Sequence, residues 1–417
     1  MRILYNILTH IAIFHVKLVS LFNNKLKLGV DGRNQTFTKL KNCIATNDKT
    51  LWFHCSSLGE YEQGLPVFEQ LKADYPHLKI VLSFFSPSGY EIRKDTEIAD
   101  VVVYLPFDTI NNSKKIIKTI NPQLVVFVKY EIWPNYLYQL HTHNIPTLLI
   151  SALFKERHSY FKWYGRFMRQ SLFYFTHIFT QDKTSKKLLE TIHYPNVTVS
   201  GDTRFDRVTN QISINNSLNF MTEFKNDKCC IVAGSTWKED EDILVPFINT
   251  IKNDSIKFII APHNIKLKDI QHLKERITKS VVLYSEHQNR DISDFDVLIL
   301  DTIGLLSKTY NYADIAYIGG AMGSTGLHNT LEAAVFGVPI IIGKDYDEFP
   351  EAKAMISKKG MFSVNNREEL FSILKQLIQN VEYRNKAGNK NSSYIKNNRG
   401  AVIQIMDYIR KYIKIKD

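Results

Sequence analysis

The sequence predicts an α/β protein built from two doubly wound parallel sheets in tandem. Short apolar runs rich in β-branched residues alternate along the chain with longer segments of helical periodicity. The runs lack polar alternation, as is typical of strands in parallel sheets that helices cover on both faces. Two successive sets of such runs in a chain of 417 residues predict two domains.

Residues 1–22 are expected to form an amphipathic helix that lies in a membrane interface. Apolar residues dominate the segment, and most of its polar residues share one helical stripe: Asn6, Thr9, His10, Lys17 and Ser20. Lys17 and this stripe fit a membrane span poorly, and no small-residue cleavage site of a signal peptide follows. The alternative is an amphipathic helix packed on the protein's own core. A basic run comes next and suits an anionic lipid surface: Lys25, Lys27, Arg33, Lys39 and Lys41.

The first sheet is expected within a domain of residues 35–206. Its predicted strands are Leu51–Cys55, Ile80–Phe85, Val101–Leu105, Leu124–Lys129, Thr147–Ile150, Ile178–Thr180 and Val197–Ser200. The boundary is predicted between Asp206 and Asp227, where NQISINNSLN is polar and has no helical or strand period.

The second sheet is expected within a domain of residues 227–395. Its predicted strands are Cys230–Ala233, Phe258–Ala261, Val281–Tyr284, Val297–Leu300, Ile315–Ile318, Pro339–Ile342 and Met361–Val364. Residues 396–417 are predicted to form a basic terminal helix.

The distribution of charge argues against nucleic acid as a partner. The formal net charge is +11, but residues 1–50 carry +6, residues 381–417 carry +6, and the body between them carries −1. A neutral body is unsuited to a groove for a nucleic-acid backbone. The four cysteines form no disulfide framework and have no metal-ligand spacing, which indicates a reducing compartment.

Two glutamates follow predicted strands of the first sheet, where ligands of open α/β sheets bind. Glu60, in Ser57-Leu-Gly-Glu60, fits a capping box and equally a general base that projects into a cleft between the two sheet edges. Glu131, in KYEIWPN, has no helix to cap because Pro134 interrupts the backbone, so a salt bridge and a catalytic role are both open.

The segment Gly319–Ala334 runs from a strand through a glycine loop into a helix. Glycines permit close approach of the backbone, and a helix N-terminus stabilises phosphate. Glu332 lies one turn into the helix, where it can cap through Asn329-x-x-Glu332 or accept hydrogen bonds from a ribose. The segment matches neither G-x-G-x-x-G nor a Walker loop, so we expect a nucleotide other than a dinucleotide or ATP.

Arg204, near the domain boundary, is expected either to form an interdomain ion pair or to stabilise a departing phosphate. Three Asp-x-Asp pairs occur, at 240–242, 294–296 and 345–347, but none follows a strand with metal-ligand geometry. We therefore predict no metal site.

Together, HCSSLGEYEQGLPV, KYEIWPN, GDTRFDRV, AGSTWKEDE and GLHNTLEAAVFGVPIIIG resemble one family in order along the chain. This family is the 3-deoxy-D-manno-octulosonic acid (Kdo) transferases of lipopolysaccharide synthesis, which have the GT-B fold of two Rossmann-like domains facing across a cleft. The last motif is shared more loosely with other GT-B glycosyltransferases. In related GT-B folds the terminal helix crosses back to the first domain.

The resemblance implies an inverting, metal-independent transfer of Kdo from CMP-Kdo to a phosphorylated lipid A precursor at the cytoplasmic face of the inner membrane. It implies no cofactor, CMP-Kdo being a co-substrate. By motif, Glu60 is the general base, Glu131 assists the transition state, and Arg204 stands where the family usually has lysine. The positions implied to hold CMP are Pro262, His263, Ile303, Gly304, Leu305, Asn329, Thr330, Leu331 and Glu332.

Two departures from the family pattern concern binding. Leu65 replaces a common arginine after EQG, and Leu305 replaces a common glutamate that can contact a ribose. Two rival functions stay open, a GT-B transferase that uses a UDP-sugar on another lipid acceptor and a catalytically silent lipid-binding scaffold.

Overall fold

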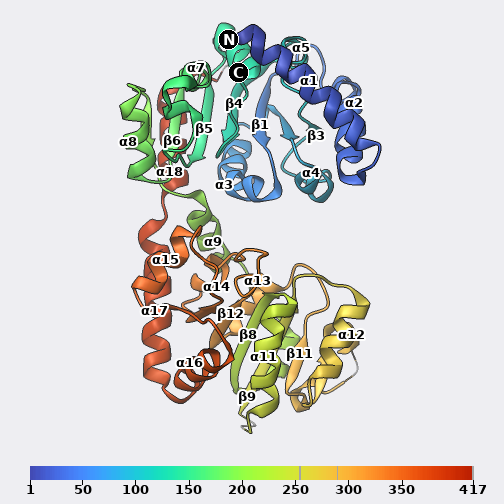
Figure 1. Ribbon diagram of the computed structural model, residues 1–417, viewed down its shortest axis with the longest axis vertical. Coiled ribbons are helices and arrows are strands. Elements are labelled where there is room, and N and C mark those ends of the chain that lie inside the picture. Colours follow the sequence, from blue (N-terminus) through green and yellow to red (C-terminus); the bar gives the residue numbers. More distant parts are fainter. Residues whose placement is uncertain (253–254, 289, 416–417) are drawn as a thin grey trace. The chain divides into compact units, whose positions relative to one another are not determined.

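The computed structural model describes residues 1–252, 255–288 and 290–415, which form two compact units. The first unit contains Met1–Arg207 and Arg399–Asp417, and the second contains Val208–Asn398. Each unit has one parallel sheet between layers of helices (Figure 1). The predicted pair of doubly wound sheets is therefore confirmed.

The first sheet has seven parallel strands in the order β3-β2-β1-β4-β5-β6-β7. Its strands are β1 (Thr50–Cys55), β2 (Lys79–Phe84), β3 (Val101–Tyr104), β4 (Pro122–Val128), β5 (Thr147–Ala152), β6 (His177–Thr180) and β7 (Val197–Val199). Alternate residues of β1 enter different cores, because successive side chains of a strand point to opposite faces. Phe53 joins a core with the helices Leu58–Asp74, Pro87–Arg93 and Ala401–Tyr412, whereas Trp52 joins a core on the opposite face of the sheet.

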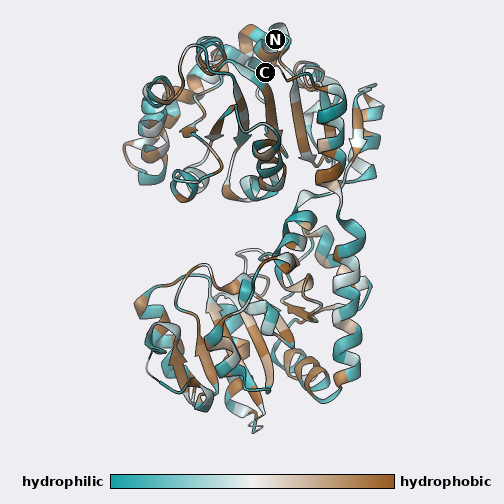
Figure 2. Cartoon of the chain, turned by 180° about the vertical axis from the view of Figure 1, so that it is seen from behind, coloured by the Kyte–Doolittle hydropathy of each residue, from teal (hydrophilic) through white to brown (hydrophobic). Residues whose placement is uncertain are grey.

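The second sheet also has seven parallel strands, in the order β10-β11-β9-β8-β12-β13-β14. Its strands are β8 (Cys229–Thr236), β9 (Ile256–Pro262), β10 (Val281–Leu283), β11 (Val297–Ile299), β12 (Ile315–Ile318), β13 (Ile340–Ile342) and β14 (Met361–Ser363). One face packs on α11, α12 and α16. In both units the strands carry the strongest hydrophobic colouring, as expected for buried parallel sheets (Figure 2).

The helices around the first sheet are α1 (Arg2–Ser20), α2 (Asn24–Cys43), α3 (Leu58–Asp74), α4 (Pro87–Arg93), α5 (Ile110–Ile120), α6 (Pro134–Thr142), α7 (Arg166–Leu172), α8 (Lys183–Thr191) and α18 (Ala401–Tyr412). Helix α9 (Thr203–Ser213) contains the boundary between the units. The second unit has α10 (Asn219–Lys225), α11 (Lys238–Thr250), α12 (Leu267–Arg276), α13 (Leu306–Thr309), α14 (Leu331–Ala334), α15 (Pro350–Ser357), α16 (Arg367–Gln379) and α17 (Val381–Asn398). Short 3-10 helices are Ser159–Phe161, Trp163–Gly165, Tyr284–Glu286, Ile292–Asp294 and Tyr310–Tyr312.

Helix α1 turns part of its polar stripe, Asn6, Thr9 and Ser20, toward the protein and leaves most of its apolar residues exposed. Ser20 is buried and Asn6 is half-buried, whereas Ile3 is 78% exposed and Phe14 is 66% exposed. The alternative in which the apolar side of this helix packs on the protein's own core is therefore wrong. By length and composition, α1 is the one helix in the described part of the chain that qualifies as a candidate membrane span.

Three further expectations need correction: the first concerns the segment after Asp206, the second the terminal helix, and the third the basic run. The polar segment NQISINNSLN is helical up to Ser213, because α9 carries apolar residues at helical spacings of three and four: Phe205, Val208 and Ile212. The terminal helix begins at Ala401 and not at residue 396, because Gly400, with φ of +107°, separates it from α17.

The predicted basic run does not all face outward. Arg33 donates hydrogen bonds to the backbone oxygens of Leu105 (Nε, 3.0 Å), Gly29 (Nη1, 2.8 Å) and Phe85 (Nη2, 2.6 Å). Its guanidinium therefore fastens α2 to the ends of β2 and β3. Arg33 cannot serve a lipid surface in this position.

Candidate active site

Glu60 and Glu131 lie at the point where the strand order of the first sheet reverses. β1 and β4 are neighbours there, although β2 and β3 intervene in the chain. Glu60 lies in the first turn of α3, directly after β1, and Glu131 follows β4. The carboxyl ends of strands at such a reversal are where ligands bind in open α/β sheets.

Glu60 is a buried carboxylate that reaches back over the start of its own helix. It is 8% exposed and accepts a hydrogen bond from the Ser56 backbone N–H. The reciprocal half of a capping box is missing, because the Ser57 side chain makes no cap hydrogen bond. Burial first, and then the negative charge of Glu131, raise the pKa of Glu60 to about 8. This carboxyl is thus tuned toward proton exchange near neutral pH.

One carboxylate oxygen of Glu131 lies within hydrogen-bond distance of two ring nitrogens. Its Oε2 lies 2.9 Å from His54 Nε2 and accepts a hydrogen bond from Trp133 Nε1 at 2.8 Å. Glu131 is 7% exposed and His54 is fully buried. A histidine, which the salt-bridge alternative did not name, is thus a direct partner of Glu131.

His54 and Trp133 were missed by the sequence analysis. His54 lies on the same face of β1 as Trp52, and its Nδ1 lies 2.9 Å from Ser83 Oγ. Nδ1 also lies 3.1 Å from the Ser83 carbonyl oxygen, and Trp133 Nε1 lies 3.2 Å from His54 Nε2, so the imidazole links Ser83 to the Glu131–Trp133 pair. The sequence does place a histidine and a serine, His54 and Ser83, within otherwise apolar strands. That pattern is equally typical of polar residues buried in a core without a catalytic role.

Arg204 pairs with a carboxylate of its own segment. Its Nη2 lies 2.7 Å from Asp202 Oδ2, and its Nε donates to the same oxygen at 2.8 Å. Asp202 in turn accepts a hydrogen bond from Gln63 Nε2 at 3.2 Å, and Arg207 pairs with Glu62. Gln63 lies about one helical turn after Glu60 on α3. These contacts therefore join the Arg204 segment to the helix that carries Glu60.

The strand order of the second sheet reverses between β8 and β12, and three aromatic rings stack there. Trp237 Nε1 donates to His328 Nε2 at 2.9 Å, and the two rings are within 12° of parallel. His263 stacks on both, with ring centroids 4.6 Å from Trp237 and 4.4 Å from His328. Burial, followed by the charge of His263, lowers the pKa of His328 to about 4, which keeps its Nε2 an acceptor. Sequence analysis identified His263 but missed Trp237 and His328.

The predicted nucleotide-binding segments come together in this unit. Pro262 ends β9 and is followed by His263, whose stack on His328 joins it to the segment that begins at Asn329. Ser307 Oγ donates to Glu332 Oε2 at 2.8 Å, which joins α13 to α14. The predicted positions 303–305 directly precede α13. Ile303 is 89% exposed, Gly304 has a φ of +94°, and Leu305 is the N-cap residue of α13.

The start of α14 presents polar groups that a nucleotide can use. Asn329 Nδ2 donates to Glu332 Oε1 at 3.0 Å, and Asn329 Oδ1 accepts from the Leu331 N–H at 3.2 Å. Thr330 is the N-cap residue, and its buried Oγ1 has no hydrogen-bond partner. Asn329 and Glu332 therefore contact each other through their side chains, and Glu332 does not accept the backbone N–H of Asn329 as a capping box requires.

The glycine loop after β12 is required by close backbone approach. A Cβ at Gly319 would lie 2.4 Å from Ser235 O, and Gly320 has a φ of +97°. Asp240, at the start of α11, accepts the Gly320 N–H at 2.9 Å and the Trp237 N–H at 2.9 Å. Asp240 therefore fixes the loop and the aromatic stack with one buried carboxylate.

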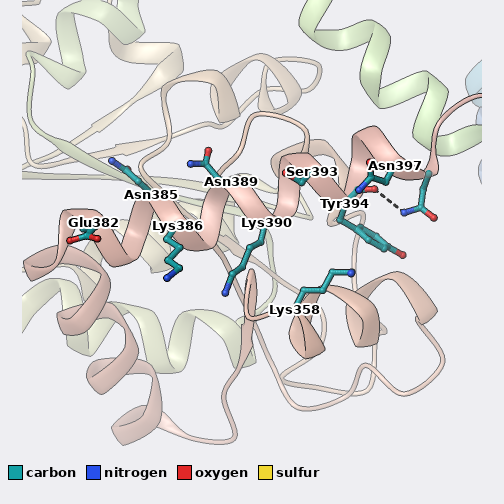
Figure 3. Close-up of a pocket in the computed structure, with 10 residues that line it drawn as sticks. Lys358, Glu382, Asn385, Lys386, Asn389, Lys390, Ser393, Tyr394 and Asn397 are labelled. Carbon is teal, nitrogen blue, oxygen red and sulfur yellow. Dashed lines mark hydrogen bonds between the residues drawn. The ribbon is translucent and has the colours of Figure 1, made fainter.

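A shallow groove of about 1120 Å³ lies elsewhere, along the exposed side of α17 (Figure 3). It is lined by Lys358, Glu382, Asn385, Lys386, Asn389, Lys390, Ser393, Tyr394, Asn397 and Asn398. These residues are on helices and not at the carboxyl ends of strands, so we do not assign the chemistry to this groove. In the described ranges, no cluster of three or more His, Cys, Asp or Glu side chains is arranged to hold a metal ion.

Comparison with known proteins agrees with the motifs. Residues 31–207 match the family model of 3-deoxy-D-manno-octulosonic-acid transferase (kdotransferase). The chain is 27% identical over 377 residues to 3-deoxy-D-manno-octulosonic acid transferase of Haemophilus influenzae, covering 87% of each protein. This chain is similar to Kdo transferases over most of its length. It is also 27% identical to the Aquifex aeolicus transferase, over 81% of this chain and 88% of that one. The predicted resemblance is confirmed, as is the assignment to the glycosyltransferases.

Solved structures agree on the fold alone. UDP-GlcNAc 2-epimerase from Neisseria meningitidis superposes with a TM-score of 0.62 at 18% identity, over 87% of this chain and all of that one. MurG from Acinetobacter baumannii gives a TM-score of 0.54 at 12% identity, over 87% and 99% of the two chains. The predicted GT-B class, with two Rossmann-like sheets, is thereby confirmed.

Proposed function

We propose that this protein transfers Kdo from CMP-Kdo to a phosphorylated lipid A precursor, with inversion and without a metal ion, in lipopolysaccharide synthesis. The observation that carries the proposal is the carboxylate pair at the strand-order reversal of the first sheet. Glu60, with its pKa raised to about 8, lies close enough to Glu131 to feel its charge, and both residues stand in motifs that resemble those of the Kdo transferases. The family resemblance supports the donor and the acceptor class.

In the proposed reaction, Glu60 removes the proton from the acceptor sugar hydroxyl. The hydroxyl oxygen forms a bond to the anomeric carbon of Kdo as the bond from that carbon to the CMP phosphate breaks. The electron pair leaves with CMP, and the proton stays on Glu60. Glu131, held by His54 and Trp133, stabilises positive charge that develops on the sugar, and the Arg204 guanidinium neutralises the departing phosphate.

CMP is proposed to bind the second unit at the predicted positions, with Pro262 and His263, residues 303–305 and residues 329–332 around it. The Ser307–Glu332 hydrogen bond and the stack of His263 on His328 support this, because these contacts join the three segments. A nucleobase is a planar ring that can stack on the exposed side of such an arrangement.

We further propose that α1 holds the protein on the cytoplasmic face of the inner membrane. The exposed apolar residues of α1 support a helix that lies along the lipid surface, with Ile3, Leu4, Ile7, Leu8, Ile11, Phe14 and Leu18 facing outward. Its polar side packs on the first unit, which favours lying on the membrane over spanning it.

The decisive test is the mass of the product formed from CMP-Kdo and a lipid A precursor, with EDTA present. A mass increase of one or more Kdo units supports the proposal, and consumption of UDP-sugars but not CMP-Kdo contradicts it. The Glu60→Gln variant, shown by circular dichroism to be folded, distinguishes the transferase from a catalytically silent lipid-binding scaffold. A silent lipid-binding protein would keep all cellular function in this variant, whereas a transferase would lose it.

A further inference from the structure

The polar side of α1 docks on the first turn of α6. Tyr5 Oη donates to Asp108 Oδ2 at 2.7 Å, and Asn135 Nδ2 donates to Asn6 Oδ1 at 2.9 Å. The Arg2 guanidinium lies 3.5 Å from the centre of the Tyr138 ring. All three contacts reach α6 or the carboxylate that caps it, from one side of α1.

Asp108 is the centre of this contact. Its carboxylate accepts the Asn135 N–H (Oδ2) and the Tyr136 N–H (Oδ1), each at 3.0 Å, and so caps α6, and its backbone oxygen accepts from Asn135 Nδ2 at 2.7 Å. Asp108 is 2% exposed, and burial raises its pKa to about 6 in spite of these donors. A buried carboxylate is costly without its full set of donors, so the Tyr5 hydroxyl matters to the cap as a whole.

The capped turn begins three residues after Glu131. Pro134 is the first residue of α6, and Trp133, at the N-cap position, donates from Nε1 to Glu131 Oε2. Proline fixes the backbone φ at this junction, so a shift of the first turn of α6 is passed on to Trp133. The position of α6 and the position of the Glu131 carboxylate are thereby linked through a short, stiff segment.

We propose that Tyr5 and Asp108 are positioning residues, through which α1 holds the first turn of α6 and, with it, the Glu131 carboxylate. The helix that lies on the lipid surface is then also a part of the active-site frame, and its seating sets the rate of transfer. This inference rests on the proposed function for its effect on rate. The link between α1 and α6 itself rests only on the contacts above.

The test variant is Tyr5→Phe, which removes one hydroxyl and keeps the ring that packs on Phe167 with centroids 5.3 Å apart. Hydrogen–deuterium exchange is measured on the full-length protein, for the amides of Asn135 and Tyr136. We expect exchange to be about 10-fold faster, because the cap has lost one of its donors. Amides of β5 are expected to exchange as in the wild type.

Kinetics supply the second readout. In detergent-dispersed assays, we expect Tyr5→Phe to lower kcat by about 3- to 10-fold, with KM for CMP-Kdo unchanged, since Tyr5 belongs to the first unit and the proposed CMP positions belong to the second. The matched control is Leu8→Gln on the exposed side of α1, where Leu8 is 54% exposed. It is expected to weaken binding to vesicles of phosphatidylethanolamine and phosphatidylglycerol and to leave the exchange at Asn135 and Tyr136 unchanged.

Wild-type exchange and wild-type kcat in Tyr5→Phe would overturn the inference and leave α1 as an anchor only. Asn6→Ala, which removes the second contact, gives the same decision should Tyr5→Phe fold poorly. If the wild type transfers no Kdo at all, the proposed function fails. The exchange experiment still decides the link between α1 and α6, because it needs no substrate.

Discussion

The His54 imidazole and the Glu131 carboxylate form a buried pair, with 2.9 Å between Nε2 and Oε2, although 77 residues separate them in the chain. Removal of the imidazole leaves Glu131 with one partner fewer in a site that water barely reaches. We expect His54→Ala to lower kcat by about 10- to 100-fold, the cost of leaving a buried polar group without a hydrogen-bond partner. Steady-state kinetics test this, with Ser83→Ala as a milder variant that removes only the hydroxyl beside His54 Nδ1. Equal kcat in His54→Ala and wild type would contradict a role in holding Glu131.

Glu60→Gln is expected to lower kcat by about 10²- to 10⁴-fold, the usual worth of a general base. In the wild type, the base must be ionised, so kcat/KM should rise with pH through about 8. The pH dependence of kcat/KM between pH 6 and 9.5 measures this rise. A flat profile over that range would mean that Glu60 does not act as the base.

The same substitution makes a prediction for stability. Between its ordinary pKa and about 8, Glu60 keeps a proton in the folded protein that the unfolded chain releases. The free energy of unfolding therefore falls as pH rises through this window, and Glu60→Gln removes that loss. Denaturant titrations at pH 5 and pH 9 should give a gain from Glu60→Gln that is larger at pH 9, on the order of 1–3 kcal/mol.

Glu131→Gln is expected to move the acid limb of the pH profile to lower pH. The charge of Glu131 raises the pKa of Glu60, second to burial, and glutamine lacks this charge. The measurement is the midpoint of kcat/KM against pH, where activity is low but quantifiable. A midpoint that stays near 8 would indicate that burial alone sets the pKa of Glu60.

Trp237→Phe keeps an aromatic ring for His263 but loses the N–H that donates to His328. We expect the Kd for CMP to rise about 3- to 10-fold, because the ring arrangement loses one hydrogen bond. Isothermal titration calorimetry with CMP measures the change. Trp163→Phe is the control, since Trp163 is 91% exposed on the first unit, and it should bind CMP as the wild type does.

Asp206 caps α18 from a distant part of the chain, accepting the N–H groups of Gly400 at 2.7 Å and Ala401 at 3.0 Å. Loss of an N-cap costs about 1–2 kcal/mol, so Asp206→Ala should lower the free energy of unfolding of the first unit by that amount. Asp407→Ala, at an exposed position of the same helix, should change it by less than about 0.5 kcal/mol. Similar losses in the two variants would argue against the cap.

Apolar runs such as Leu51–Cys55 identified all the strands of both sheets, because buried parallel strands need continuous hydrophobic residues. The same reasoning failed at the polar segment after Asp206, where few but regularly spaced apolar residues sustain α9. It also misread Arg33, since a pattern of basic residues does not reveal which of them finds backbone acceptors.

The sequence by itself determined the strands, the glycine loop and the motif positions of Glu60, Glu131 and Glu332, since these depend on local pattern and on residue type. Only the tertiary structure decided their partners. His54 meets Glu131 because β1 pairs with β4, and Trp237 meets His328 because β8 pairs with β12. Tyr5 reaches Asp108 because α1 lays its polar side on the first unit. Contacts between residues far apart in the chain depend on strand order and helix packing, which no local pattern encodes.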